Sequence, residues 1–426
     1  MNMRHFKSVK RYLLTILLSQ TIYLSHASYI LIPMDENQTN HLKAYGIAFL
    51  AIQKEINVNW LLNYKGGSFL IKSNNVIENE CNIRNVSYNL IADLQSNKIL
   101  RDISSNEVNQ EVIRLEKTPR VAIYSPKNKQ PWDDAVTLAL TYAEIPYDVI
   151  YDEEVLSNLL PLYDWLHLHH EDFTGQYGKF YASFKNTTWY KDQKSLYEKN
   201  AKKLGYNKVS QVKLAVAKKI KTFVEGGGFL FAMCSATDSY DIALASEGID
   251  ICQHMFDGDA IDNNINEKLD FSKTLAFKNF NLIRDPNKYE FSSIDATQTR
   301  RVKPNLDFFT LFEFSAKWDP VPTMLCQNHM QVIKGFMGQT TSFKNQYLKS
   351  DVIVMGETKA TNEARYIHGK LGNGTWTFYG GHDPEDYQHK VGDPKTDLSL
   401  HQNSSGYRLI LNNILFPAAK KKKLKT

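Results

Sequence analysis

Residues 226–239 read GGGFLFAMCSATDS, and this stretch decides the fold. The apolar run 229–233 is typical of a buried strand, and the small residues after Cys234 allow a tight turn into a helix. An amphipathic segment, 208–225, precedes the glycines, which are typical of a helix end. No Gly-Lys-Ser/Thr follows, so the glycines do not form a P-loop. The pattern predicts an α/β unit with Cys234 at the carboxyl end of a strand.

The same pattern recurs along the chain. Strand-like runs at 120–124, 147–152, 163–168, 351–357 and 374–380 alternate with helix-like segments, among them 132–145. Asp133 or Asp134 caps this last segment. The alternation predicts an α/β fold with a doubly wound, mainly parallel sheet over 118–416. Residues 240–340 break the rhythm and are interpreted as a large insertion. Strand and helix patterns in 28–115 predict a separate N-terminal α/β unit.

Both ends of the chain are basic. Residues 1–27 combine Arg and Lys with a short apolar run and small residues before Ser28, which predicts a cleaved signal peptide. The protein is therefore expected to be exported, periplasmic or extracellular, and not transmembrane after cleavage. Residues 417–426 form a basic tail. Residues 1–27 contribute +4 and the tail contributes +5 to the net charge of +5, so residues 28–419 carry −4 and are not expected to bind nucleic acid.

Three polar clusters each follow a predicted strand: HLHHED at 167–172, CSATDS at 234–239 and GGHDPED at 380–386. Ligands of open α/β sheets bind at the carboxyl ends of the strands, so the clusters are expected to form one cleft. Its ligand would be a small molecule, a saccharide or a peptide. The candidate substrate-binding residues are His167, His169, His170, Glu171 and Asp383.

Cysteine chemistry is one interpretation of this cleft. At a strand-to-helix turn, helix N–H groups lower the pKa of a thiol, and a histidine can serve as its base. Cys234 and His382 are the candidates for these roles. The alternative for Cys234 is a buried core thiol, since free cysteine is among the most buried residue types.

Metal binding is a second interpretation. Histidine and carboxylate ligands suit zinc or another divalent ion, and His169, His170 and Glu171 are the candidates. With His382 nearby, three ligands and an open position would form a catalytic site. Hydrogen-bonded histidines that line a polar cleft are the alternative. The sequence indicates no other cofactor.

A glycine-rich strand that ends in cysteine, followed much later by one that ends in His-Asp-Pro-Glu, resembles the class I glutamine amidotransferase-like superfamily, including its trehalose-utilisation-type branch. The resemblance covers about residues 118–240 and 350–416. It implies a flavodoxin-like fold and a triad of Cys234 as nucleophile, His382 as base and Glu385 as orienting acid. This chain has one more residue between His382 and Glu385 than the family's His-x-Glu.

The whole chain also resembles an exported bacterial family commonly labelled asparagine synthetase B, in stretches such as WLLNYKGGSFL and GGHDPEDYQHKVGDP. The motifs do not support that activity, because the mature chain would begin at Ser28 rather than cysteine and CSATDS lacks the glycines of a pyrophosphate loop. The sequence predicts an exported cysteine-dependent amidohydrolase or acyl-transfer enzyme. The alternatives are a non-catalytic ligand- or protein-binding module and a metal-dependent hydrolase.

Overall fold

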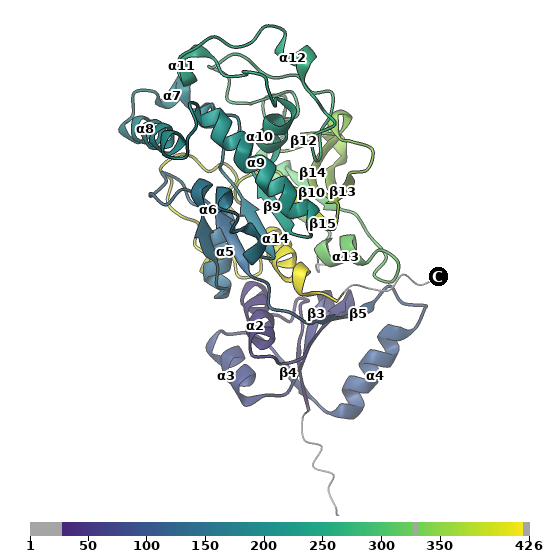
Figure 1. Ribbon diagram of the computed structural model, residues 1–426. Helices are drawn as coiled ribbons and strands as arrows, with labels where there is room; N and C mark the ends of the chain where they lie inside the picture. The colour runs from purple at the N-terminus through teal and green to yellow at the C-terminus, as the bar shows by residue number, and fades with distance from the viewer. Residues whose placement is uncertain (1–27, 327–329, 421–426) are drawn as a thin grey trace, which may run out of the picture.

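The computed structural model describes residues 28–326 and 330–420, which form two sheets and the helices around them (Figure 1). The predicted signal peptide and residues 421–426 of the predicted basic tail lie outside the described residues. The smaller sheet lies at the bottom of Figure 1, and the larger sheet lies above it. No helix in the described part of the chain has both the length and the apolar character to cross a membrane.

The smaller sheet has five strands in the order β4-β1-β3-β2-β5, and every pairing in it is antiparallel. The predicted helices and strands of this part are present. The short turn between β2 and β3 makes this pair a hairpin, which imposes antiparallel pairing on it, whereas parallel pairing needs a long crossover. Its elements are β1 (Tyr29–Ile32), α2 (His41–Gln53), β2 (Val58–Leu62), β3 (Ser68–Lys72), α3 (Asn75–Ile83), β4 (Asn89–Ile91), α4 (Asp93–Ser104) and β5 (Glu111–Leu115).

The larger sheet is mixed. Its strand order is β11-β10-β13-β14-β15-β9-β8-β6-β7, with β12 paired to β14. The run from β15 to β7 is parallel, and the strands from β11 to β15 pair antiparallel. The strands are β6 (Val121–Tyr124), β7 (Asp148–Ile150), β8 (Trp165–Leu168), β9 (Phe229–Met233), β10 (Phe308–Leu311), β11 (Val332–Lys334), β12 (Phe343–Lys344), β13 (Ile353–Thr358), β14 (Glu363–Leu371) and β15 (Gly374–Tyr379).

The α/β class is therefore confirmed. The prediction of a mainly parallel sheet is not confirmed, because the described strands of the smaller sheet and the strands from β11 to β15 pair antiparallel. Short connections join β13 to β14 and β14 to β15, and such hairpins impose antiparallel pairing. The apolar runs from which these strands were predicted contain no information on the direction of their partners. The predicted insertion contributes β10 and β11, which extend the sheet at its edge.

Helices cover both faces of the parallel strands. Along β9, Phe231 and Met233 join the core that contains α5 and α14, whereas Leu230 and Ala232 face the core beneath α9 and α10. The helices are α5 (Ala135–Ala143), α6 (Asp152–Leu156), α7 (Tyr181–Phe184), α8 (Thr188–Lys203), α9 (Val209–Glu225), α10 (Ser235–Ala245), α11 (His254–Asp257), α12 (Ile265–Lys268), α13 (Pro320–Cys326) and α14 (Ser405–Leu415).

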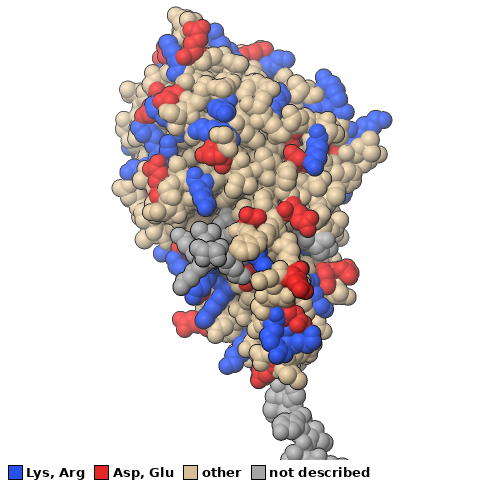
Figure 2. All heavy atoms as spheres, turned by 90° about the vertical axis from the view of Figure 1, so that its right-hand side faces the viewer, with Lys and Arg blue, Asp and Glu red and all other residues tan. Residues whose placement is uncertain are grey.

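The two sheets share one continuous core. Helix α2 of the smaller part packs against α5 and α14, and a single apolar cluster contains Ile30 and Trp60 of the smaller sheet together with Trp165 and Phe231 of the larger one. Over the face shown in Figure 2, basic and acidic side chains are interspersed.

A buried lysine lies at the carboxyl end of the parallel strands. Lys213 of α9 has a side chain that is 1% exposed, and its Nζ lies 3.1 Å from carboxylate oxygens of both Asp152 and Glu171. It also donates hydrogen bonds of 2.8 Å to the hydroxyls of Tyr124 and Tyr151. Burial opposes the charge of Lys213, but the two carboxylates outweigh burial and raise its pKa.

Replacement of Lys213 by Ala should lower the free energy of unfolding by about 3–5 kcal/mol, because Asp152 and Glu171 would remain buried without a cation. Urea denaturation followed by circular dichroism measures this. Lys218→Ala is the matched control on the same helix, since Lys218 is 54% exposed and its ion pair with Glu247 is at the surface. The control should change the free energy by less than about 0.5 kcal/mol. Equal effects of the two substitutions would contradict a special role of Lys213.

Candidate functional site

Cys234 occupies a strained turn between β9 and α10. It is the N-cap of α10, and its backbone angles are φ 53° and ψ −140°. This region favours glycine, and a residue with a side chain held there costs about 1–3 kcal/mol. The turn is fixed from both sides, since the N–H of Ala236 donates to the carbonyl of His169 at 2.9 Å and the N–H of Thr237 donates to the carbonyl of Cys234 at 3.2 Å. A strained strand-to-helix turn of this kind is typical of nucleophile elbows.

The thiol of Cys234 is buried and protonated at neutral pH. The residue is 2% exposed, and its Sγ accepts a hydrogen bond of 3.3 Å from the N–H of Gln339. Burial raises the pKa of Cys234 to about 11, although the main-chain N–H groups of Gln339, Ser235 and Thr340 act in the opposite direction. The expected low-pKa thiolate is therefore not present in this conformation.

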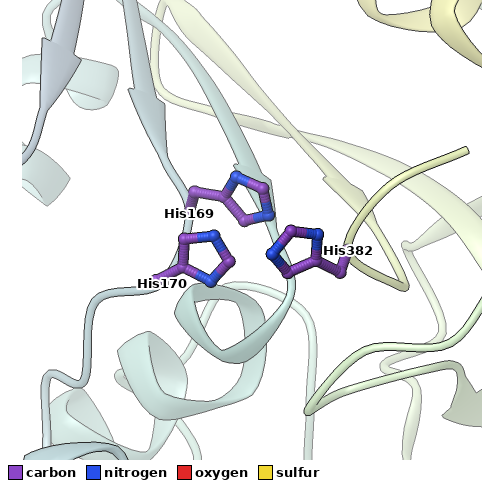
Figure 3. A group of neighbouring side chains, drawn as sticks. All are labelled: His169, His170 and His382. Atoms are coloured by element: carbon purple, nitrogen blue, oxygen red, sulfur yellow. The ribbon is translucent and has the colours of Figure 1, made fainter. Parts of the chain in front are cut away.

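Three histidines converge beside the elbow (Figure 3). His169 and His170 follow β8, and His382 follows β15; one ring nitrogen from each lies within 4.8 Å of the others. The ring centroids are 3.8 Å apart for His169 and His170 and 4.4 Å apart for His170 and His382. The three rings lie side by side in Figure 3: those of His169 and His170 are stacked with an interplanar angle of 16°, and that of His382 is tilted by 39° against His170.

The start of α5 orients two of these rings. The Asp134 carboxylate caps α5 and lies 3.0 Å from Nδ1 of His169. The carbonyl oxygen of Asp133 lies 2.8 Å from Nε2 of His170. A carboxylate or carbonyl on one imidazole nitrogen fixes the ring and leaves the other nitrogen for a ligand.

His382 has no such partner. It is 6% exposed, and among the described residues neither of its ring nitrogens has a hydrogen-bond partner. Both ring nitrogens of His169 also lack a hydrogen bond there, although the Asp134 carboxylate lies 3.0 Å from Nδ1. Burial, together with the neighbouring histidines, holds the pKa of both His170 and His382 well below the usual range, so these rings are neutral at pH 7.

A fourth histidine, His389, was not among the residues predicted from the sequence. Its ring stacks on His382 with centroids 4.6 Å apart, and its nitrogens lie 3.0 Å from Asp133 and 2.8 Å from Asp386. The nearby Asp133 carboxylate is the main reason that the pKa of His389 is raised to about 9, and this residue is therefore a cation at neutral pH. The sequence feature that could have indicated His389 is its position in GGHDPEDYQHKVGDP, where it follows His382 within one polar loop.

The residues after His382 do not assemble the implied triad. Glu385 lies 3.2 Å from Nδ1 of His401, and the described residues show no contact between Glu385 and His382. Asp383 is fully buried; it accepts hydrogen bonds from the Tyr407 hydroxyl at 2.7 Å and from the Glu385 N–H at 2.8 Å. The extra residue makes a tight turn around Asp383 that carries Glu385 away from His382, so Asp383 has a structural role and is not free to bind substrate.

Two residues of HLHHED also lie outside the histidine cluster. Glu171 faces Lys213, so it is not placed as a metal ligand with His169 and His170. His167 is fully buried, with Nδ1 3.2 Å from the Phe231 carbonyl and Nε2 3.1 Å from Asp134. The strand alternation explains this, because His167 points into the core where β8 is covered by α5.

Two cavities meet at the cluster. One, of about 480 Å³, is lined by His170, His382, His389 and Cys234. The other, of about 270 Å³, reaches His169, His170 and the two aspartates at the start of α5. A larger hollow, of about 640 Å³, lies at the opposite end of β9 near Gly226 and has no histidine or cysteine in its lining. The three histidines and Cys234 therefore line cavities at the carboxyl edge of the strands, which is where open α/β sheets bind their ligands.

Comparisons with known proteins place little constraint on this site. No family model and no curated protein matches the chain. Among solved structures, Cytoplasmic Protein STM3548 from Salmonella typhimurium is 10% identical, with a TM-score of 0.35, and the match covers 71% of this chain and 100% of that one. Cytoplasmic Protein STM1381 from Salmonella typhimurium LT2 is 11% identical over the same shares, with a TM-score of 0.33.

A third solved structure is Gan42B, a GH42 beta-galactosidase from G. stearothermophilus, which is 13% identical over 63% of this chain and 28% of that one, with a TM-score of 0.26. At TM-scores this low, none of these likenesses indicates the fold or the activity of this chain.

The thiol of Cys234 should react slowly with iodoacetamide at pH 7.5, and the rate should rise about tenfold per pH unit between pH 8 and 10, because only the thiolate reacts. Peptide-resolved mass spectrometry measures the rate at Cys234 separately from that at Cys81, a core thiol whose pKa is raised to about 12. Rapid labelling of Cys234 that does not change between pH 6 and 8 would contradict a protonated thiol.

Proposed function

We propose that this protein is a hydrolase that depends on a divalent metal ion bound by His169, His170 and His382. The observation that carries the proposal is the convergence of three ring nitrogens within 4.8 Å at a position where His382 has no hydrogen-bond partner among the described residues. A buried polar atom without a partner costs free energy, and coordination to a metal removes that cost.

The three histidines fit such an ion. Neutral imidazole is the form that binds metal, and the lowered pKa values of His170 and His382 supply that form at pH 7. Asp134 on His169 and the Asp133 carbonyl on His170 are the outer contacts that metal-binding histidines usually have. Three histidines with an open position are typical of catalytic zinc.

When bound, zinc at such a site supplies a Lewis acid and lowers the pKa of a coordinated water. The protein's own contribution is to hold the rings and the substrate. Asp134 and Asp133 fix two of the rings, and the ring of His389 packs against His382 on the cavity side. His170 and His382 both line the cavity of about 480 Å³, where a substrate would lie against the cluster.

The parallel half of the larger sheet supports a more specific assignment of fold. Strands β7, β6, β8, β9 and β15 are parallel, have helices on both faces and carry Cys234 and His382 at the ends of adjacent strands. We infer a flavodoxin-like arrangement of the class I glutamine amidotransferase-like superfamily, including its trehalose-utilisation-type branch, with the antiparallel strands as additions. Export to the periplasm or the cell exterior remains part of the proposal.

Cysteine-dependent amide or acyl hydrolysis is the second candidate. It is favoured by the strained backbone of Cys234 and by the main-chain N–H groups around its sulfur, an arrangement that can stabilise an oxyanion. The protonated thiol and the position of Glu385 away from His382 make it the weaker of the two.

After equilibration with zinc and dialysis, the full chain should retain roughly one zinc ion per molecule, measured by inductively coupled plasma mass spectrometry. His382→Ala and His169→Ala should lose most of it. His254→Ala is the control, because His254 lies on α11 and is exposed. Absence of zinc from the wild type, or full retention by His382→Ala, would contradict the proposal. Hydrolysis of p-nitrophenyl acetate with chelator and with Cys234→Ala then separates the two candidates.

A further inference from the structure

One wall of the cavity of about 480 Å³ is aromatic. Trp132, Phe180, Phe184 and Tyr289 line it. The rings of Trp132 and Phe180 stack with centroids 5.2 Å apart, and those of Phe180 and Tyr289 are 5.6 Å apart. These residues come from the segment before α5, from α7 and its preceding turn, and from the predicted insertion. Three distant parts of the chain therefore build one continuous surface.

The aromatic wall is held in place without a ligand. Trp189 packs edge-on behind Trp132, with centroids 5.6 Å apart. The side-chain amide of Gln339 donates to the carbonyls of Gly178 at 2.6 Å and Tyr289 at 3.0 Å, which ties the insertion to the turn before α7. A surface that is already ordered binds a ligand at a lower entropic cost.

The lining of the cavity also contains polar groups. Thr297, Gln388 and Lys390 belong to it, together with Gly338. The centroid of the Trp132 ring lies 5.5 Å from that of His170, so a group on the aromatic wall lies directly beside the histidines. The cavity thus combines aromatic rings, hydrogen-bonding groups and two of the candidate metal ligands, His170 and His382.

We propose that this cavity binds the pyranose ring of a saccharide. A pyranose has a flat face of C–H groups, which the electron-rich face of an aromatic ring attracts, and a rim of hydroxyls that need hydrogen-bond partners. An aryl or alkyl group would match the aromatic residues but would leave Thr297, Gln388 and Lys390 without partners, at a cost in free energy. The size also lies within the usual range for ligand cavities.

The inference rests on the proposed function in one respect: the hydrolysable substituent of the saccharide would reach His170 and His382. The ring-binding surface itself consists of aromatic residues that are not metal ligands. Binding of the ring is therefore measurable whether or not a metal is present.

Saturation-transfer difference NMR on the full chain tests the proposal, with glucose, galactose and N-acetylglucosamine as probes and benzoate as an aromatic comparison. At least one sugar should receive saturation on its ring C–H protons. Trp132→Ala should weaken its binding about tenfold, and Trp132→Phe should weaken it less because a ring face remains. Trp318→Ala is the matched control, since Trp318 is 59% exposed and lies outside the cavity.

Absence of transfer to all three sugars, undiminished transfer in Trp132→Ala, or stronger binding of benzoate than of every sugar would overturn the inference. Circular dichroism and zinc content of Trp132→Ala show whether that variant is folded. If the wild type binds zinc and no sugar, the saccharide inference alone fails. If it binds a sugar and no zinc, the proposed metal-dependent function fails and the ring-binding site stands.

Discussion

The parallel pairing of β8, β9 and β15 is the constraint on which the site depends. Leu168 is level with Ala232, and Tyr379 is level with Met233, so the three strands end at nearly the same height. The residues that follow the strand ends therefore emerge at one edge of the sheet: His169 and Cys234 come directly after their strands, and His382 follows Tyr379 after two glycines. This register brings His169, Cys234 and His382 together although they are far apart in the chain. A slip of one residue in either pairing would turn these side chains to the opposite face.

The two aspartates at the start of α5 interact with different histidines of the site. Asp133 and Asp134 are adjacent in sequence, but their carboxylates face different histidines: Asp134 faces His167 and His169, and Asp133 faces His389. The carboxylates of Asp133 and Asp386 keep His389 charged, whereas His170 and His382 remain neutral because burial and the neighbouring histidines disfavour their charged forms. Neutral rings are what a metal ion requires, and the nearby positive charge of His389 is neutralised by its own two carboxylates.

Sequence reasoning located the elements that local pattern determines. The glycine-terminated helix, the apolar strand and the turn at Cys234 follow from periodicity and turn chemistry, and α5 was expected to be capped by Asp133 or Asp134, of which Asp134 is the cap. Strand direction and side-chain partners depend on tertiary contacts. From the sequence, Glu171 was predicted to be a metal ligand because it follows His170. In the structure it forms an ion pair with Lys213, which lies on a helix distant in sequence. Glu385 was predicted to orient His382 by analogy with the shorter His-x-Glu spacing of the resembled family. In the structure the turn around Asp383 places Glu385 beside His401 instead.

The elbow and the histidine cluster are coupled by one loop at the end of the predicted insertion. The N–H of Gln339 donates to the sulfur of Cys234, and the carbonyls of Met337 and Thr340 accept from the N–H groups of His382 and Gly381 at 3.0 Å and 2.8 Å. A Cβ on Gly338 would come within 2.7 Å of the main-chain nitrogen of His382, so only glycine allows the loop to pack this closely. Any movement of this loop would therefore change the surroundings of the thiol and the position of His382 together. The side chain of Gln339 also donates a hydrogen bond to the carbonyl of Tyr289, one of the aromatic residues of the cavity. The same loop therefore contacts all three parts of the site: the turn at Cys234, the histidine cluster and the aromatic wall.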